Sequence, residues 1–389
     1  MAQASEQVVA GMQSVRKTFY IGGKWVEPAT DKRFNLVNAS TEESLGSVPE
    51  GVEADMDRAV AAAREAFDDS SWAQTSGAER AAIMNRFADE LEKRAPEIAA
   101  TISSQNGMPI SLSQQFEAGF PILMLRYYAG LAENMEAEEQ RTSLIGQKSI
   151  VQRTPIGVAA GIVPWNFPAT LAMSKIAPAM AAGCTLVLKP SPGTALDWYL
   201  VAEAAAQAGV PAGVLNWVPG DRAAGAHLVA HPGVDKVAFT GSTAAGRKVA
   251  QVCGEALRPV TLELGGKSAG IVLDDADLDV TIPGLQFASL MNNGQTCLAS
   301  TRILAPESRY NEVVDALAEM ANGLAVGDAM DEATQCGPMA SAEHRDRVMG
   351  YVERGKQEAR CVVGGGKPGG LDRGWFVAPT IFADVDNNA

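Results

Sequence analysis

The feature that most constrains the fold is the alternation of apolar runs and helical segments between residues 156 and 264. The apolar runs read IGVAAGIV, CTLVLK, GVLNWV and KVAFT. They are separated by segments with helical spacing of apolar residues, such as ALDWYLVAEAAAQAG and TAAGRKVAQVCGEAL. Strands that are apolar throughout are typical of a parallel sheet with helices on both faces. The alternation therefore predicts an α/β fold.

The segments on either side extend this prediction. Residues 19–51 alternate short apolar runs with turn residues and are expected to form strands, whereas 55–97 and 111–135 have the apolar spacing of helices. TSLIGQKSIVQRTPIGV is expected to form a hairpin around Gly146. After TLELGGKSAGIVL a second α/β region is expected, with a glycine-rich surface loop at 363–374.

Length and charge limit the class of protein. A chain of 389 residues, 47% of them hydrophobic, can bury two or more domain cores. A formal net charge of −14 argues against a nucleic-acid or anionic-membrane surface. The first twenty residues lack a basic start followed by an apolar core, so we expect no signal peptide and a cytoplasmic protein.

One uncharged stretch, residues 154–174, has the length of a membrane span. It contains three prolines and Asn166, which would break a helix and bury polar groups in lipid. We therefore interpret it as a buried strand that runs into a turn.

The cysteines indicate a reducing compartment. Five cysteines, widely spaced and without a CxxC pair, favour neither a disulfide framework nor a structural zinc site, and we expect no metal. Cys297 lies in MNNGQTCLAS, where it is either a small buried hydrophobe or a nucleophile. A hydrolase that pairs Cys297 with one of the three histidines stays open, because partners can meet in space.

Two motifs lie where predicted strands end. AFTGSTAAGRK places Gly241 and Ser242 before a predicted helix, whose free N–H groups could bind an anion, although Ser242 as a helix cap explains the pattern equally well. LVLKPSP places Lys189 at the carboxyl end of a buried strand, where α/β sheets bind ligands. Taken alone, Lys189 is better interpreted as a solvated lysine.

Two further motifs offer polar groups for chemistry. In GIVPWNFPA, Asn166 lies between two prolines, where a fixed amide could stabilise an oxyanion or simply complete a turn. In VTLELGGKSAG, Glu263 lies within an apolar strand. Its carboxylate is either on an exposed face, as strict alternation predicts, or in a partly desolvated site suited to a general base.

Taken in order, PWNFP, KPSP, FTGST, LELGGK and GQTC resemble the NAD(P)-dependent aldehyde dehydrogenase superfamily, and the resemblance covers nearly the whole chain. It implies a Rossmann-like cofactor domain, a second α/β catalytic domain and a small β-hairpin for oligomerisation. The corresponding ranges are 1–139 with 153–262, 263–389, and 140–152. A homodimer or homotetramer is implied for the full-length form.

The resemblance also assigns catalytic roles. Cys297 is implied to attack an aldehyde, Asn166 and the backbone N–H of Cys297 to hold the oxyanion, and Glu263 to activate the water that hydrolyses the thioester. NAD or NADP is implied as cofactor, with NAD favoured. The residues implied to bind it are Ile162, Pro164, Trp165, Lys189, Gly220, Gly225, Gly241, Ser242, Gly246, Leu264 and Gly265. The aldehyde is implied to pass Phe167, Leu171 and Ser174.

Two departures from the family pattern bear on these expectations. Pro192 stands three residues after Lys189, where many NAD-preferring members carry a glutamate. The sequence ends before the EEIFGP-like segment of the family, and we expect a C-terminally incomplete catalytic domain. A CoA-acylating semialdehyde dehydrogenase and a catalytically silent relative are the alternatives; Glu263 argues against the first, and the complete catalytic set against the second.

Overall fold

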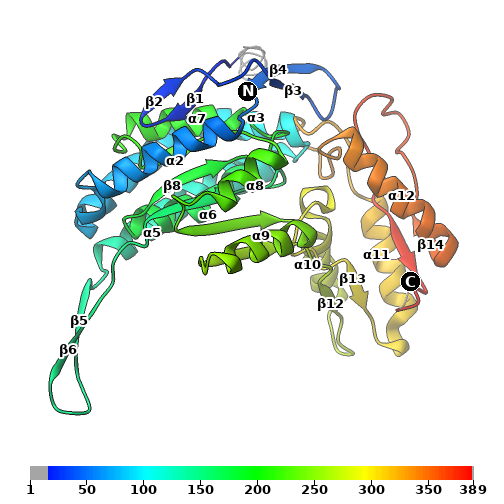
Figure 1. Cartoon of the computed structure of the whole chain (residues 1–389). Helices are drawn as coiled ribbons and strands as arrows, with labels where there is room; N and C mark the ends of the chain where they lie inside the picture. The colour runs from blue at the N-terminus through cyan, green and yellow to red at the C-terminus, as the bar shows by residue number, and fades with distance from the viewer. Residues whose placement is uncertain (1–15, 388–389) are drawn as a thin grey trace.

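The structure is a computed structural model that describes residues 16–387; most of the N-terminal segment for which no signal peptide is expected lies outside the described residues. Within residues 16–387 the largest sheet has seven strands in the order β11-β10-β7-β8-β9-β1-β2 (Figure 1). The five strands from β11 to β9 run parallel, and β1 joins β9 antiparallel. The strands are β1 (Phe19–Ile21), β2 (Lys24–Val26), β7 (Val158–Ile162), β8 (Thr185–Lys189), β9 (Leu215–Trp217), β10 (Lys236–Gly241) and β11 (Val260–Leu264).

Both faces of this sheet are covered, as the apolar strands predict. Every residue of β7 and β8 is buried. Val158 and Ala160 on β7 face one hydrophobic core, whereas Ala159 between them belongs to the other. This alternation is the two-residue period of a strand expressed on two buried faces.

The helices divide between the two faces (Figure 1). One core is completed by α3 (Gly77–Asn106), α5 (Phe120–Glu133), α6 (Pro168–Ala181) and α7 (Asp197–Gln207). The other is completed by α2 (Glu53–Asp68), α8 (Arg222–Ala230) and α9 (Thr243–Glu255). A short helix α4 (Ile110–Ser113) and a π-helical turn η2 (Gln114–Gly119) connect α3 to α5. The helical segments expected before residue 135 are thus confirmed.

Before residue 153, two antiparallel pairs lie outside the main sheet. β3 (Arg33–Val37) pairs with β4 (Ser44–Pro49), in the region where strands are expected. β5 (Glu138–Thr142) and β6 (Lys148–Gln152) form the expected hairpin, which starts two residues earlier than the expected 140. Figure 1 shows this hairpin projecting away from the rest of the molecule. Leu144, Ile145 and Ile150 are exposed on it.

The region after β11 has a third hydrophobic core of its own. Its strands are short: β12 (Ala269–Ile271) pairs parallel with β13 (Arg302–Leu304), and β14 (Arg360–Val363) pairs antiparallel with β15 (Ile381–Ala383). The remaining elements are α10 (Leu278–Leu290), η3 (Met291–Gly294), α11 (Tyr310–Asn322) and α12 (Ala342–Glu358), with single 3₁₀ turns at Trp72–Gln74 and Glu307–Arg309. The glycine-rich loop is confirmed between β14 and β15.

None of the helices within residues 16–387 is both long and apolar enough to cross a membrane. The uncharged stretch 154–174 contains strand β7, a turn and the start of α6. The interpretation as a strand that runs into a turn is therefore confirmed.

Candidate active site

The residues expected to bind a cofactor lie along the carboxyl ends of the parallel strands. Ile162 ends β7 and pairs in register with Lys189 at the end of β8. Gly241 ends β10 and pairs with Leu264 at the end of β11. Strands β8 and β10 flank β7 on opposite sides, so the order of the sheet reverses at β7. Open α/β sheets bind ligands at such a switch point.

Lys189 is buried, with 7% of its surface exposed, so its interpretation as a solvated lysine is wrong. Its Nζ donates hydrogen bonds to the carbonyl oxygens of Pro190 at 3.0 Å and Gly220 at 2.7 Å. Burial lowers the pKa of Lys189 to about 8, although the negative charge of Asp221 opposes this shift. The ammonium is therefore fixed at the sheet edge by two backbone acceptors.

The helix after β10 begins as the sequence predicts. Ser242 is the N-cap of α9, and its hydroxyl accepts a hydrogen bond from the backbone N–H of Ala245 at 3.3 Å. The N–H groups of Thr243 and Ala244 in the first turn have no partner inside the helix. The cap interpretation and an anion site at the same helix end are therefore compatible.

Most glycines at this edge of the sheet lie so close to neighbouring protein atoms that a side chain would not fit. A Cβ on Gly225 would lie 3.2 Å from Cε of Lys189, and a Cβ on Gly246 would lie 2.5 Å from Cδ2 of Leu264. Gly220 and Gly241 are similarly crowded by neighbouring side chains, whereas a Cβ on Gly265 would meet open space. Packing within the protein therefore disfavours a side chain at four of these five glycines.

The turn between β7 and α6 holds Asn166 beside the cysteine loop. The Asn166 side-chain amide donates to the carbonyl oxygen of Gln295 at 2.8 Å. Its own backbone carbonyl accepts from the side-chain amides of Asn106 at 3.2 Å and Asn292 at 2.9 Å. Trp165, one residue earlier, packs edge-on against His344 of α12 with ring centroids 4.8 Å apart. Pro164 and Trp165 are half-buried.

Cys297 is exposed, so its interpretation as a buried hydrophobe is wrong. It follows the loop that Asn166 binds, and a Cβ on Gly266 would lie 3.7 Å from the Cys297 carbonyl oxygen. Cys184, Cys253 and Cys336 are buried, and all five cysteines are free. The exposed thiol thus lies where the PWNFP and LELGGK segments meet.

Glu263 lies on an exposed face of β11, as strict alternation predicts. Its register partner on β10 is Thr240, whose hydroxyl accepts a hydrogen bond from Nζ of Lys175 at 2.7 Å. Burial lowers the pKa of Lys175 to about 8, and the negative charge of Glu263 opposes this shift. Lys175 on α6 is therefore within electrostatic range of the carboxylate, a neighbour that the sequence pattern did not reveal.

Aromatic side chains gather next to the PWNFP turn. The ring of Phe116 lies 6.4 Å from Phe167, 6.2 Å from Phe287 and 6.5 Å from Phe120, measured between centroids. Phe287 and Phe120 are exposed, at 53% and 43%. Of the residues expected to flank the aldehyde, only Phe167 belongs to this cluster. Phe116 and Phe120 lie four residues apart and Phe287 lies far from both in sequence; the sequence did not identify any of the three.

A buried carboxyl group supports the same turn. Glu117 in η2 is 1% exposed, and its Oε2 accepts from the N–H of Ala169 in the first turn of α6 at 2.8 Å. Burial raises the pKa of Glu117 to about 8, helped by the nearby Asp197 charge and opposed by hydrogen bonds from Ala169 and Thr170. Glu117 therefore caps the helix that begins just after Asn166.

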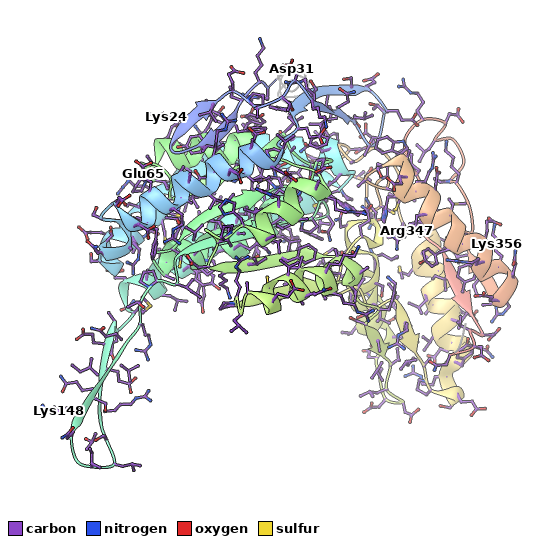
Figure 2. All side chains as sticks on the ribbon, in the orientation of Figure 1. Lys24, Asp31, Glu65, Lys148, Arg347 and Lys356 are labelled. Carbon is purple, nitrogen blue, oxygen red and sulfur yellow. The ribbon has the colours of Figure 1, made fainter. Side chains whose placement is uncertain are left out.

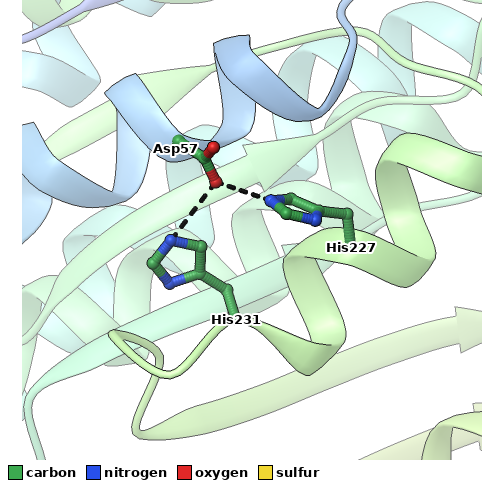
Figure 3. Close-up of side chains that lie close together, drawn as sticks. All are labelled: Asp57, His227 and His231. Carbon is green, nitrogen blue, oxygen red and sulfur yellow. Dashed lines mark hydrogen bonds and ion pairs between the residues drawn. The ribbon is translucent and has the colours of Figure 1, made fainter.

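Asp57 lies between His227 and His231, and these three side chains are close enough together to hold a metal ion (Figure 3). Oδ1 of Asp57 is 2.5 Å from Nε2 of His227 and 3.4 Å from Nε2 of His231. The N–H of Gly233 donates to Nδ1 of His231 at 2.9 Å, so the neutral ring carries its proton on Nε2, facing Asp57. These contacts form a hydrogen-bonded clamp between α2 and α8, with no free His231 Nε2 for a metal. The third histidine, His344, packs against Trp165.

Comparison with known proteins identifies the family to which this chain is similar. The model of the Aldehyde dehydrogenase family matches residues 25–389. Geranial dehydrogenase of Castellaniella defragrans is 59% identical over 370 residues, which are 95% of this chain and 77% of that protein. Phenylacetaldehyde dehydrogenase of Pseudomonas fluorescens is 40% identical over 370 residues, 94% of this chain and 74% of that protein.

Solved structures with a similar fold are also aldehyde dehydrogenases. The NAD⁺ complex of an aldehyde dehydrogenase from Bacillus cereus has a TM-score of 0.93 at 38% identity, over 97% of this chain and 77% of that one. A mutant of aldehyde dehydrogenase C from Pseudomonas syringae, in complex with NAD⁺ and octanal, has a TM-score of 0.91 at 37% identity, over 96% of this chain and 78% of that one.

Proposed function

Because the chain belongs to the aldehyde dehydrogenase family, whose members oxidise aldehydes with NAD(P)⁺, we propose that it does so through a covalent intermediate on Cys297. The observation that carries the proposal is the meeting of three segments. The Cys297 thiol is exposed, Asn166 binds the loop that leads to it, and Gly266 of the Glu263 segment lies against its carbonyl. These contacts support a common site for the proposed nucleophile Cys297, the proposed oxyanion donor Asn166 and the proposed base Glu263.

The proposed reaction begins when the Cys297 thiolate attacks the aldehyde carbonyl carbon. The new C–S bond moves the C=O electron pair onto oxygen, and this oxyanion is held by the Asn166 amide and the backbone N–H of Cys297. When bound, the nicotinamide supplies the acceptor for the hydride that leaves the substrate carbon. The electron pair on oxygen then restores the C=O bond, and a thioester remains on Cys297.

Glu263 is proposed to resolve the thioester as a general base. Its exposed carboxylate takes a proton from water, the resulting hydroxide attacks the thioester carbon, and the C–S bond breaks to release the carboxylic acid and the thiolate. A CoA-acylating enzyme would need no such base. Glu263 therefore favours hydrolysis over transfer to CoA.

The sheet edge is proposed to hold the cofactor, and its donors fit a dinucleotide. The Lys189 ammonium and the exposed start of α9 at Ser242 supply the hydrogen-bond donors that ribose hydroxyls and a pyrophosphate require. Ile162, Pro164 and Trp165 would line the same edge, as would Leu264 and Gly265. Gly220, Gly225, Gly241 and Gly246 would complete it.

Both NAD and NADP are proposed to bind, with NAD favoured. Pro192 places no carboxylate three residues after Lys189, so a 2′-phosphate meets no repulsion from that position. The similar aldehyde dehydrogenase from Bacillus cereus forms an NAD⁺ complex.

The substrate is proposed to be an apolar aldehyde. The aromatic rings of Phe116, Phe167 and Phe287 lie together beside Asn166, and such a surface binds hydrocarbon better than hydroxylated or charged chains. Ser174, exposed on α6, adds little bulk. The similar geranial dehydrogenase is named for an apolar aldehyde.

The domain organisation of the chain is proposed to follow that of the family. Residues 1–139 and 153–262 would form the cofactor-binding domain and 263–389 the catalytic domain. The hairpin at 140–152, with exposed Leu144, Ile145 and Ile150, would join copies into a cytoplasmic homodimer or homotetramer.

Pre-steady-state kinetics test the mechanism. The chain, mixed with NAD⁺ or NADP⁺ and a panel of apolar and charged aldehydes, should give a burst of reduced nicotinamide and then steady turnover with the apolar members. Glu263→Gln should keep the burst and lose turnover, whereas Cys297→Ala should lose both. Unchanged turnover in Glu263→Gln would refute the hydrolytic assignment, and no burst with any aldehyde would favour a catalytically silent relative.

A further inference from the structure

We propose that Asn292 is a positioning residue for the oxyanion donor: its side-chain amide fixes the backbone of Asn166 against the loop that carries Cys297. The inference rests on the proposed function, because it assigns Asn166 to the oxyanion. Asn292 is five residues before Cys297 and is 2% exposed. It acts through Asn166 and needs no contact with the substrate.

The backbone of the loop places Asn292 by an uncommon conformation. Asn292 has φ 53° and ψ 46°, Asn293 has φ 61° and ψ 27°, and Gly294 has φ 75°. Three consecutive left-handed residues turn the chain sharply after α10. Asparagine tolerates this region better than other residues with a side chain, but glycine adopts it without strain. The conformation alone would therefore favour glycine at position 292.

The side chain explains why asparagine is present instead. Nδ2 of Asn292 donates to the backbone carbonyl of Asn166 at 2.9 Å, across 126 positions of the sequence. Its Oδ1 is buried without a hydrogen-bond partner among the described residues. A buried acceptor without a donor is unfavourable, so the amide is retained at some cost in stability. The donor function of Nδ2 is the part of this side chain that the structure uses.

This hydrogen bond completes a closed ring of three residues. Asn292 donates to the Asn166 carbonyl, the Asn166 side chain donates to the Gln295 carbonyl at 2.8 Å, and the Gln295 N–H donates to the Asn292 carbonyl at 2.9 Å. A side-chain amide has two N–H donors. The ring uses one of those on Asn166 and holds the amide in a fixed orientation, which leaves the second for an oxyanion.

Asn106 also donates to the Asn166 carbonyl, but it does not join the Asn166 turn to the loop that carries Cys297. Its Nδ2 is shared between the carbonyls of Trp165 and Asn166, each at 3.2 Å, and it lies at the end of α3. Asn292 is the donor that belongs to the cysteine loop itself. Loss of the Asn292 amide should therefore let Asn166 move relative to Cys297. The turn at Trp165 and Asn166 would still be held to α3 by Asn106.

The adjacent Asn293 provides a matched control. It has the same left-handed backbone, and its side chain donates to the carbonyls of Gly107 and Pro338 and accepts from the N–H of Gly337. None of these bonds involves Asn166. Substitution of Asn293 removes hydrogen bonds from the same loop without breaking the ring.

The test measures the burst of reduced nicotinamide with octanal in Asn292→Gly, Asn293→Gly and Asn166→Ala, and in Asn166→Ala combined with Asn292→Gly. We expect Asn292→Gly to slow the burst about 10- to 100-fold, less than the roughly 100- to 1,000-fold loss caused by removal of an oxyanion donor, because the Asn166 amide is still present. Asn293→Gly should slow it less than about 3-fold. In the Asn166→Ala background, Asn292→Gly should have almost no further effect, because both changes act on one interaction.

A second readout separates positioning from general damage to the loop. Alkylation of Cys297 by iodoacetamide does not need the Asn166 amide, so its rate should be unchanged in Asn292→Gly. Should the glycine variant fold poorly, Asn292→Asp keeps the shape and the left-handed backbone but lacks the donor, and it should slow the burst similarly.

Three results would overturn the inference. These are a burst in Asn292→Gly within 2-fold of the unchanged chain, equal losses in Asn292→Gly and Asn293→Gly, or effects of Asn292→Gly and Asn166→Ala that multiply. If the unchanged chain itself gives no burst, the proposed function fails first and this inference falls with it.

Discussion

Replacement of Lys189 by methionine tests whether this buried lysine serves the cofactor or only the fold. Methionine keeps the apolar stem but removes the donors to the carbonyls of Pro190 and Gly220. A lost hydrogen bond to a charged group is worth about 1.5–3 kcal/mol. If the ammonium also binds cofactor, affinity for NAD⁺ should fall about 10- to 100-fold.

The effect on stability should depend on pH. Burial lowers the pKa of Lys189 from its ordinary 10.5 to about 8. Between these values the unfolded chain holds a proton that the folded chain has released, so the free energy of unfolding rises with pH. The rise amounts to about 3 kcal/mol when it is complete. Lys189→Met lacks this rise in the free energy of unfolding. Its stability should therefore lie further below that of the unchanged chain at pH 10 than at pH 7.

Urea unfolding at pH 7 and pH 10 measures the stability difference, and a fluorescence titration measures NAD⁺ binding. Lys24→Met, on β2 and labelled in Figure 2, is the control for loss of one lysine, since Lys24 is exposed. If the affinity for NAD⁺ is unchanged in Lys189→Met, the proposed role of Lys189 in cofactor binding is refuted. A stability difference that is the same at both pH values would refute the lowered pKa.

Two further predictions concern the packing around the site. Burial raises the pKa of Glu117 to about 8, so the folded chain keeps a proton that the unfolded chain releases above about pH 4.5, and stability should fall as pH rises through this range. Glu117→Gln should remove a slope of about 1 kcal/mol per pH unit between pH 5 and 7, which urea unfolding at both values would reveal. Gly246→Ala should lower the Tm by several degrees, because the new Cβ would lie 2.5 Å from Leu264, whereas Gly254→Ala on the same helix meets nothing within 4 Å and should not. Equal Tm values for the two alanine variants would refute the packing argument.

The sequence was informative where structure depends on local periodicity. The apolar runs of β7 and β8 and the alternation around Glu263 predicted burial and exposure correctly, because each side chain's face follows from its position in the strand. Ser242 was recognisable as a cap for the same reason.

Features that depend on distant neighbours could not be predicted in this way. The burial of Lys189 depends on the carbonyl of Gly220, 31 residues away, and the role of Asn292 depends on Asn166. Asn-Asn-Gly is a recognisable turn signal, but nothing local shows which carbonyl its amides will reach. Aromatic residues of the Phe116 cluster likewise meet only in the folded chain.

Helix α6 connects the two chemical stages that the site is proposed to perform. Asn166 lies just before its first turn, which Glu117 caps, and Lys175 lies on the same helix within electrostatic range of Glu263. Hydrogen bonds between residues four apart link each turn of a helix to the next, so we expect a shift at the start of α6 to reach Lys175, about two turns later. Loss of the Glu117 cap should therefore disturb both the oxyanion donor and the surroundings of the base. We therefore expect the buried groups Glu117 and Lys175 to influence the geometry of the proposed site together with the exposed Cys297 and Glu263.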